Sequence, residues 1–284
     1  MSLPSLNLPP ILDTSSANMA DDFYKPALSV AVRYDRGVGF FSSGWLRVLA
    51  KGLTKFAANG GKGRVITSPM LSKADWEALE TGESARANET LRNALAKNID
   101  QLAQDLEKNT LSALAWMIAD EILTFKLALP KNKLAGGDFH DKFGIFTDVE
   151  NNQVSFSGSP NESVQGFLNY ESNKIFHSWL PHMQPFVEAD IKRFERLWQN
   201  EDENVRTYDL PEAAREQILK LREGERPYPQ PPWLREQQLK ESGVVYQPAR
   251  PQLPKHISLR DYQNEAIDAW FAHDCRGLFE MATG

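Results

Sequence analysis

The chain has 284 residues, of which 41% are hydrophobic and 25% charged, a composition that favours a globular protein with a full core and excludes a disordered one. A formal net charge of −6 argues against a protein that coats nucleic acid indiscriminately, because such binding draws on clustered Lys and Arg. The sequence has no long apolar run and no charged-then-apolar leader, so we expect a cytoplasmic protein without a membrane partner. The single cysteine, Cys275, excludes an internal disulfide.

The first part of the chain predicts an arm, early strands and a long helical region. Residues 1–20 carry Pro and Ser and predict an arm. Strands are expected at residues 28–34 and 64–68, with a helix at 43–58 between them. From 73 to 126 the pattern is helical, which we interpret as a helical insertion that covers the sheet or contributes to a dimer contact. Its apolar residues recur at helical spacing: Leu91, Leu95, Ile99, Leu102 and Leu106.

Residues 138–147 alternate polar and apolar side chains around a glycine and predict a strand with one buried face. Three apolar residues point to one face of this strand, namely Phe139, Phe143 and Ile145. Three polar residues point to the other, namely Asp138, His140 and Lys142. His140 and Lys142 are therefore expected side by side, where a nucleophile and a cation can share one phosphate.

A second strand is expected at 153–158, and it leads into Gly158-Ser159-Pro160-Asn161. This tetrapeptide predicts a turn followed by the start of a helix, because Ser159 and Asn161 are residues that cap helices. Both side chains can donate hydrogen bonds to phosphate oxygens, as can the free N–H groups of a helix start. Each piece alone is common, and Glu171 alone predicts only a solvated charge, so the conjunction is what points to a phosphodiester-cleaving site.

The remaining elements complete an α/β pattern. A strand is expected at 172–178, a helix at 183–199 and a polar helix at 211–222. Residues 224–256 carry seven prolines and predict a semi-rigid connector.

His-x-Lys on one strand, Gly-Ser-x-Asn after the next and a carboxylate ten residues later resemble the phospholipase D superfamily, whose signature is His-x-Lys-x4-Asp followed by Gly-Ser-x-Asn. The resemblance covers about the first 200 residues and implies a mixed β-sheet flanked by helices. It also implies that unprotonated His140 attacks phosphorus to form a phosphohistidine, while Lys142, Ser159 and Asn161 stabilise the charge on the phosphoryl oxygens. Glu171 matches the family's later glutamate, which holds the nucleophilic histidine.

The sequence departs from the signature at one position. Thr147 stands where the family has its aspartate, and the aspartate falls one residue later, at Asp148. In the family this carboxylate mainly supports the site, so Asp148 and Gly158 are expected as supporting residues only.

The same resemblance implies a dimer. A second histidine must protonate the leaving alcohol, yet none of the others has a lysine two residues later: His177, His182, His256 and His273. Family members with one motif copy complete the site by pairing two protomers, so we expect a homodimer with one shared site.

The family chemistry needs no metal, and we expect no cofactor for this domain. The metal alternative would use Asp138 and His140, with Asp148 as a further ligand. One histidine with scattered carboxylates lacks a recognisable ligand spacing, which makes this the weaker hypothesis.

The C-terminal segment predicts a helix from Ile257 to Phe271 with a serine cap, followed by a short strand at 277–284. Leu-Arg-x-Tyr-Gln-x-x-Ala followed by Ala-Thr-Gly resembles the opening of a superfamily 2 helicase. In such helicases the glutamine that matches Gln263 recognises adenine, but the lysine that holds phosphates is absent from this chain. We therefore expect ATP and Mg²⁺ only in a longer protein that continues the helicase.

The sequence thus predicts a phospholipase D-like domain at 1–200, a helical and Pro-rich linker at 201–256 and the truncated start of a helicase at 257–284. The expected activity is metal-independent cleavage of DNA within a nuclease–helicase fusion, and restriction-like defence is the biological analogy. Two alternatives stay open: a lipid-directed enzyme of the same family, and a non-catalytic module that holds DNA for the helicase.

Overall fold

The computed structural model divides the chain into two compact units, Met1–Arg235 and Glu236–Gly284. The residues it describes are 1–40, 52–69, 89, 93–100, 104, 108–131, 139–158, 172–231, 233–234 and 260–272. Within these residues no helix is long and apolar enough to cross a membrane.

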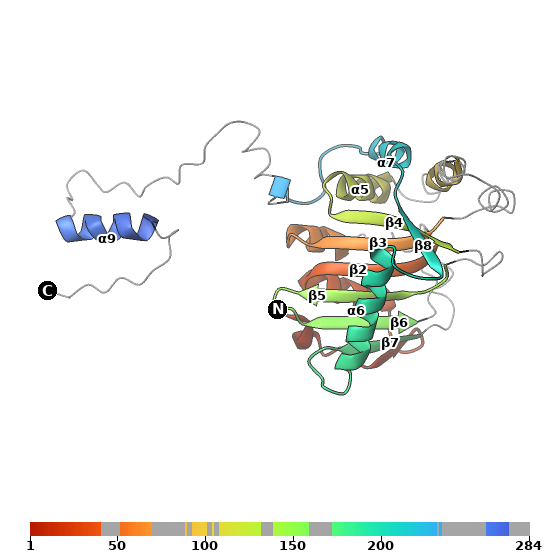
Figure 1. The fold of residues 1–284 in the computed structure, drawn as a ribbon, viewed down its shortest axis with the longest axis horizontal. Coiled ribbons are helices and arrows are strands. Elements are labelled where there is room, and N and C mark those ends of the chain that lie inside the picture. Colours follow the sequence, from red (N-terminus) through yellow and green to blue (C-terminus); the bar gives the residue numbers. More distant parts are fainter. Residues whose placement is uncertain are drawn as a thin grey trace. The chain divides into compact units, whose positions relative to one another are not determined.

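Within the described residues, the first unit is built on one eight-stranded mixed sheet with helices on its faces, which confirms the expected α/β class (Figure 1). The strands lie in the order β1-β7-β6-β5-β2-β3-β4-β8. Their bounds are β1 Ile11–Asp13, β2 Ala31–Phe40, β3 Lys62–Ser68, β4 Leu123–Pro130, β5 Phe143–Asp148, β6 Gln153–Gly158, β7 Ser172–His177 and β8 Val205–Asp209.

The strand directions give the sheet two chemically different edges. β2, β3 and β4 run parallel to one another, and the other neighbouring pairs are antiparallel. The ends of the parallel strands therefore meet the end of β6 and the starts of β5 and β7. We name this the motif edge, and its strand-terminal residues are Phe40, Ser68, Pro130, Phe143, Gly158 and Ser172. The opposite turn edge carries the other ends of β5, β6 and β7, at Asp148, Gln153 and His177.

Apolar side chains cover both faces of the sheet. One face packs against α1 (Lys25–Val30) and α5 (Lys108–Ala119), and Phe146 lies in this larger cluster. The other face is crossed by α6 (Gln184–Trp198), which Figure 1 shows running over the strands. Because both faces are covered, all six residues of β5 are buried.

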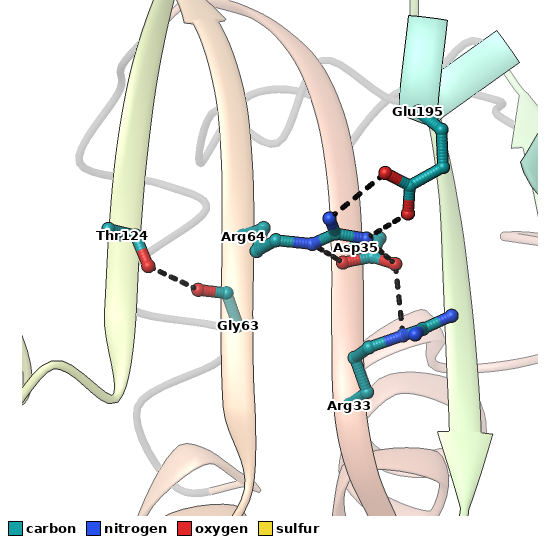
Figure 2. A network of polar contacts seen from close by, with 6 residues as sticks. All are labelled: Arg33, Asp35, Gly63, Arg64, Thr124 and Glu195. Carbon is teal, nitrogen blue, oxygen red and sulfur yellow. Dashed lines mark hydrogen bonds and ion pairs between the residues drawn. The ribbon is translucent and has the colours of Figure 1, made fainter. Parts of the chain in front are cut away.

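A network of charged side chains fastens α6 to the sheet (Figure 2). Arg64 donates to Asp35 at 2.7 and 2.8 Å and to Glu195 of α6 at 2.6 and 3.2 Å. Burial acts to lower the pKa of Arg64, but the hydrogen bonds to the two carboxylates outweigh it and raise that pKa above its ordinary value. The hydrogen bond from Arg64 also lowers the pKa of Glu195. Arg64 therefore stays charged and holds α6 in place.

The first residues of the chain are packed into the fold. The prediction that they form a separate arm is therefore wrong. Leu3 is fully buried, and its backbone N–H donates to Asp148 Oδ2 at 2.8 Å. Residues 19–24 form a π-helical turn, η2 (Met19–Tyr24), that continues into α1. The strand expected at 28–34 therefore begins only at Ala31, because residues 25–30 bury an apolar helical face.

The helical region expected at 73–126 was predicted to extend too far, because the helix ends at Ala119. Its last part belongs to α5 and then to β4, which pairs in parallel with β3. Buried apolar residues recur in β4 at every second position, the period of a strand: Leu123, Phe125, Leu127 and Leu129. Of the predicted stripe, Leu95 and Ile99 are buried, and Leu91, Leu102 and Leu106 lie outside the residues whose side chains are described.

The first compact unit also extends beyond the predicted boundary at residue 200. β8 adds to the sheet beside β4, and α7 (Glu212–Leu219) packs against α5. The start of the Pro-rich stretch is then held by buried Asp120, whose carboxylate accepts from Arg226 Nε at 2.6 Å and from the Tyr228 hydroxyl at 2.9 Å. The described residues from 205 to 231 therefore belong to the first unit, which ends at Arg235.

In the second unit, the described residues form the helix α9 (Asp261–Ala272). It begins later than the expected Ile257, and Ser258 and the strand expected at 277–284 lie outside the described residues. Gln263 Oε1 accepts from the backbone N–H of Arg260 at 3.0 Å, half of a capping box that fixes the start of the helix. Recognition of adenine by Gln263 stays a prediction.

Candidate active site

The apolar side of the predicted alternation around the His-x-Lys motif is confirmed, although the strand is shorter than expected. β5 begins at Phe143, so residues 139–142 precede it and have no regular strand pairing. Phe139, Phe143 and Ile145 nevertheless lie together in the cluster under α6. Lys142 and His140 belong to the opposite side of the alternation, away from α6.

His140 and Lys142 lie in direct contact. Lys142 Nζ is 2.9 Å from His140 Nδ1 and 3.4 Å from Nε2, and it also donates to the His140 carbonyl at 3.2 Å. An ammonium has only hydrogens to offer, so it can bond only a ring nitrogen that carries no proton. The contact places the positive charge of Lys142 directly beside the ring that the sequence predicts as the nucleophile.

The two residues differ in exposure in a way that fits different tasks. His140 is exposed, and Lys142 is only 7% exposed. A nucleophile has to reach its substrate, whereas a cation stabilises charge most strongly where water is excluded. The motif thus presents an accessible ring beside a buried positive charge.

The end of β6 and the start of β7 lie at the same edge as the His-x-Lys motif. The Gly158 N–H donates to the Lys142 carbonyl at 3.2 Å, so the end of β6 lies against the motif. Ser159 and Asn161 follow directly along the chain, and Glu171 immediately precedes β7. These three residues lie outside the described residues, and their roles stay predictions.

The end of β2 approaches the motif from the other side. Gly39 lies so close to His140 that an added Cβ would stand 3.3 Å from His140 Cδ2. At Gly37 an added Cβ would stand 2.4 Å from the Phe143 ring. The absence of two side chains on β2 is therefore what lets residues 139–143 pack against it.

Asp148 lies at the turn edge, six residues and roughly 20 Å along the strand from Lys142. It is 2% exposed, and its carboxylate accepts from the backbone N–H groups of Leu3, Glu150 and Asn152 at 2.8–3.0 Å. The carboxylate thus holds the turn after β5 and ties down the N-terminus. The expectation that Asp148 supports the site is corrected accordingly: what it supports directly is the fold.

The metal alternative loses one of its ligands for the same reason. Asp148 ends β5 whereas His140 lies before its first residue, so the two cannot bind one ion, and Asp138 lies outside the described residues. Among the described residues, no group of three His, Cys, Asp or Glu side chains has the geometry to hold a metal ion.

Sequence reasoning missed two residues next to the motif. Asp141, the middle residue of His-Asp-Lys, pairs through Oδ2 with Nη1 of Arg193 in α6 at 2.9 Å. Arg193 also pairs with Asp190 at 3.0 Å, and burial raises the pKa of Asp190, an effect that neighbouring Arg193 opposes. The alternation already placed Asp141 on the face of Phe139 and Phe143, but only the fold shows which helix covers that face.

No family model matches this chain, and no curated protein matches it. Similar solved structures include a phospholipase D family member, Nuc, from Salmonella typhimurium (14% identity, TM-score 0.39, 70% of this chain and 98% of that one). NucT from Helicobacter pylori is similar at 13% identity and TM-score 0.39, over 66% of this chain and 96% of that one. Phosphatidylserine synthase from Haemophilus influenzae is similar at 12% identity and TM-score 0.45, and the match spans 83% of this chain and 47% of the synthase.

Proposed function

We propose that this domain is a phosphodiesterase of the phospholipase D type that cleaves DNA without a metal, through a phosphohistidine on His140. The observation that carries the proposal is the contact of 2.9 Å between exposed His140 and buried Lys142. It is supported by the sheet, which brings the start of β5, the end of β6 and the start of β7 to one edge.

In the proposed first step, a ring nitrogen of His140 attacks phosphorus, and the bond from phosphorus to the leaving oxygen breaks. Lys142, with Ser159 and Asn161, stabilises the negative charge that gathers on the other phosphoryl oxygens. A second histidine gives its proton to the leaving oxygen. In the second step that histidine takes a proton from water, the hydroxide attacks phosphorus, and the phosphorus–nitrogen bond to His140 breaks.

The second histidine has to come from elsewhere in a chain with one His-x-Lys motif. His177 lies at the turn edge, at the far end of its strand from the motif, and is buried. We therefore propose a homodimer in which His140 of the partner subunit serves as the acid, with one composite site across the two-fold axis.

DNA is the proposed substrate because of the second unit, whose α9 carries the Tyr-Gln pattern of a helicase opening. A motor that moves along a duplex would bring DNA to the nuclease, and restriction-like defence is one process that uses this pairing. ATP and Mg²⁺ belong to the longer protein in this proposal, and Gln263 would contact the adenine there.

The test is cleavage of plasmid and single-stranded DNA in excess EDTA by the native chain and by His140→Ala at matched dimer content. His182→Ala is the matched control, because His182 is an exposed histidine outside the motif. Cleavage that survives EDTA, disappears in His140→Ala and persists in His182→Ala is the expected result. EDTA-sensitive cleavage would contradict the mechanism.

Two other outcomes separate the alternative functions. DNA binding without cleavage would favour the module that holds DNA, a role for which the displaced Asp148 is the motivating observation. Hydrolysis of phospholipid vesicles in place of DNA would favour the lipid-directed enzyme.

A further inference from the structure

The middle residue of the His-Asp-Lys motif connects the candidate site to the opposite face of the sheet. His140 and Lys142 lie on one side of the chain, whereas Asp141 reaches α6 on the other and pairs with Arg193 at 2.9 Å. The segment therefore carries the two residues of the proposed chemistry, His140 and Lys142. Between them lies Asp141, which anchors the segment to α6.

This anchor acts on residues that precede the regular strand. Residues 139–142 come before the first residue of β5, and the Gly158 N–H donates to the Lys142 carbonyl. Asp141 Oδ1 accepts from the Lys142 N–H at 2.9 Å, while its Oδ2 takes the ion pair with Arg193. A single carboxylate thus sets the backbone between His140 and Lys142 and ties it to the helix.

Arg193 is itself held on several sides. Its guanidinium lies 3.7 Å from the centre of the Phe143 ring, and its Nη2 pairs with Asp190 one turn earlier in α6. The Phe143 ring is in turn wedged against Gly37, where any side chain would collide with it. A planar guanidinium with two carboxylate partners and a ring beneath it has one well-defined orientation.

The helix that carries Arg193 is also fixed independently. Glu195, two residues further along α6, is held by Arg64, and the Trp198 carbonyl accepts from Lys126 at 2.9 Å. The packing of α6 on the sheet therefore does not depend on the pair between Arg193 and Asp141. That pair adds little to what already binds the helix, but it is a direct link to the motif.

We propose that Arg193 is a positioning residue for the reaction: acting through Asp141, it sets the geometry of His140 and Lys142 at the motif edge. The inference rests on the proposed phosphodiesterase function, which it deepens. Arg193 itself touches no substrate, so its loss should misplace the nucleophile and leave DNA binding unchanged.

The test compares Arg193→Gln and Arg193→Lys with Arg196→Gln. Arg196 is the matched control, because it lies on the same helix and pairs with one aspartate, Asp202. The two side chains are 2.9 Å apart, and Asp202 is not part of the motif. In steady-state cleavage we expect Arg193→Gln to lower kcat about tenfold to a hundredfold at unchanged KM, the cost of misplacing a reacting group. Arg193→Lys should recover part of this loss, since lysine keeps the charge but cannot bridge two carboxylates.

A second measurement does not depend on activity. In protein labelled with ¹⁵N-histidine, the ring signals of His140 are identified by their loss in His140→Asn. We expect them to shift in Arg193→Gln and in Asp141→Asn, and to stay in place in Arg196→Gln. The signals of His177 and His182 should not move in any of these variants, which shows that the fold is intact.

The outcomes separate the inference from the function on which it rests. Unmoved His140 signals in Arg193→Gln would overturn the positioning role, whatever the activity. If the His140 signals move in Arg193→Gln but the native protein cleaves no DNA, the positioning role is supported and the proposed nuclease function is contradicted. If Asp141→Asn and Arg193→Gln lower kcat additively in the double variant, Arg193 does not act through Asp141, and the inference fails.

Discussion

The two ends of strand β5 carry polar residues that are used in opposite ways. At the turn edge, Asp148 is buried and its oxygens are taken up by backbone donors and Asn152. At the motif edge, Lys142 is also buried, but it lies beside an exposed histidine on a segment without regular pairing. The first arrangement satisfies what the fold requires, and the second places a charge where the fold has no need of one. Polar residues of the second kind are where chemistry is to be sought.

The largest effect that separates the two ends is expected from Lys142→Met. Methionine keeps the unbranched stem but removes the charge, so we expect kcat for DNA cleavage to fall about 1000-fold, as when a group that stabilises transition-state charge is lost. The melting temperature should not fall, because desolvating an ammonium group is costly and methionine avoids that cost. Lys174→Met, at an exposed position on β7, is the control in both assays. A variant that unfolds with little change in activity per folded molecule would assign Lys142 to the fold.

Asp148→Ala should give the reverse result. It leaves the N–H groups of Leu3, Glu150 and Asn152 without their acceptor, so we expect a loss of about 3 kcal/mol in the free energy of unfolding. Urea denaturation measures this loss, with the exposed neighbour Glu150→Ala as control. Activity per folded molecule should stay within about twofold of the native value, since the site is roughly 20 Å away. A collapse of kcat in a folded Asp148→Ala protein would restore Asp148 to the site.

The same contrast shows what the sequence could and could not predict. The period of two along residues 139–146 is local, so it placed Phe139 and Phe143 on one face and the histidine and lysine on the other, before any strand was assigned. The strand expected at 153–158 is also present, as β6, and its end lies beside Lys142. The role of Asp148 in holding the N-terminus could not be predicted from a local pattern. Its partner Leu3 is 145 residues away in the chain, and only the folded N-terminus brings the two together.

The missed strands have a similar explanation. β4 carries Leu and Ala, which favour helices, directly after a helix, so its alternation was hidden within a longer helical pattern. β8 is polar on its exposed side and stands at the sheet edge, where few apolar residues mark a strand. Both were fixed by pairing with each other, a contact between segments about 80 residues apart. The pairing of Arg193 with Asp141 is likewise long-range, and no spacing in the sequence announces it.

A smaller effect, confined to the turn edge, is expected from acid. His177 is buried at the end of β7 against Trp179, and burial lowers its pKa below the ordinary value. The unfolded chain therefore binds more protons than the folded one as the pH falls below about 6.5, so stability should decrease with acid in that range. Urea denaturation at pH 7 and pH 5 should show a shallower decrease in His177→Phe than in native protein or in the exposed control His182→Phe. Equal slopes in all three would mean that His177 is charged or solvated in the fold.

The smallest expected effect tests how tightly the motif edge is packed. In Gly39→Ala the new methyl group would stand 3.3 Å from His140 Cδ2 and 3.5 Å from His140 Cα, so the histidine has to yield by a few tenths of an ångström. Because residues 139–142 lie outside the regular strand, they can give way at little cost in stability. We expect kcat to fall only about threefold, far less than the roughly hundredfold penalty of a full 1 Å displacement, with no change in melting temperature.

Gly37→Ala is the comparison variant, since its methyl group would meet the Phe143 ring at 2.4 Å, inside regular pairing on both strands. There the ring cannot yield without moving the sheet or Arg193, so a stability loss of about 1–3 kcal/mol is expected. If the two variants lost the same stability and activity, residues 139–142 would be as rigid as the strand that follows them. The ion pair through Asp141 would then not be needed to position them.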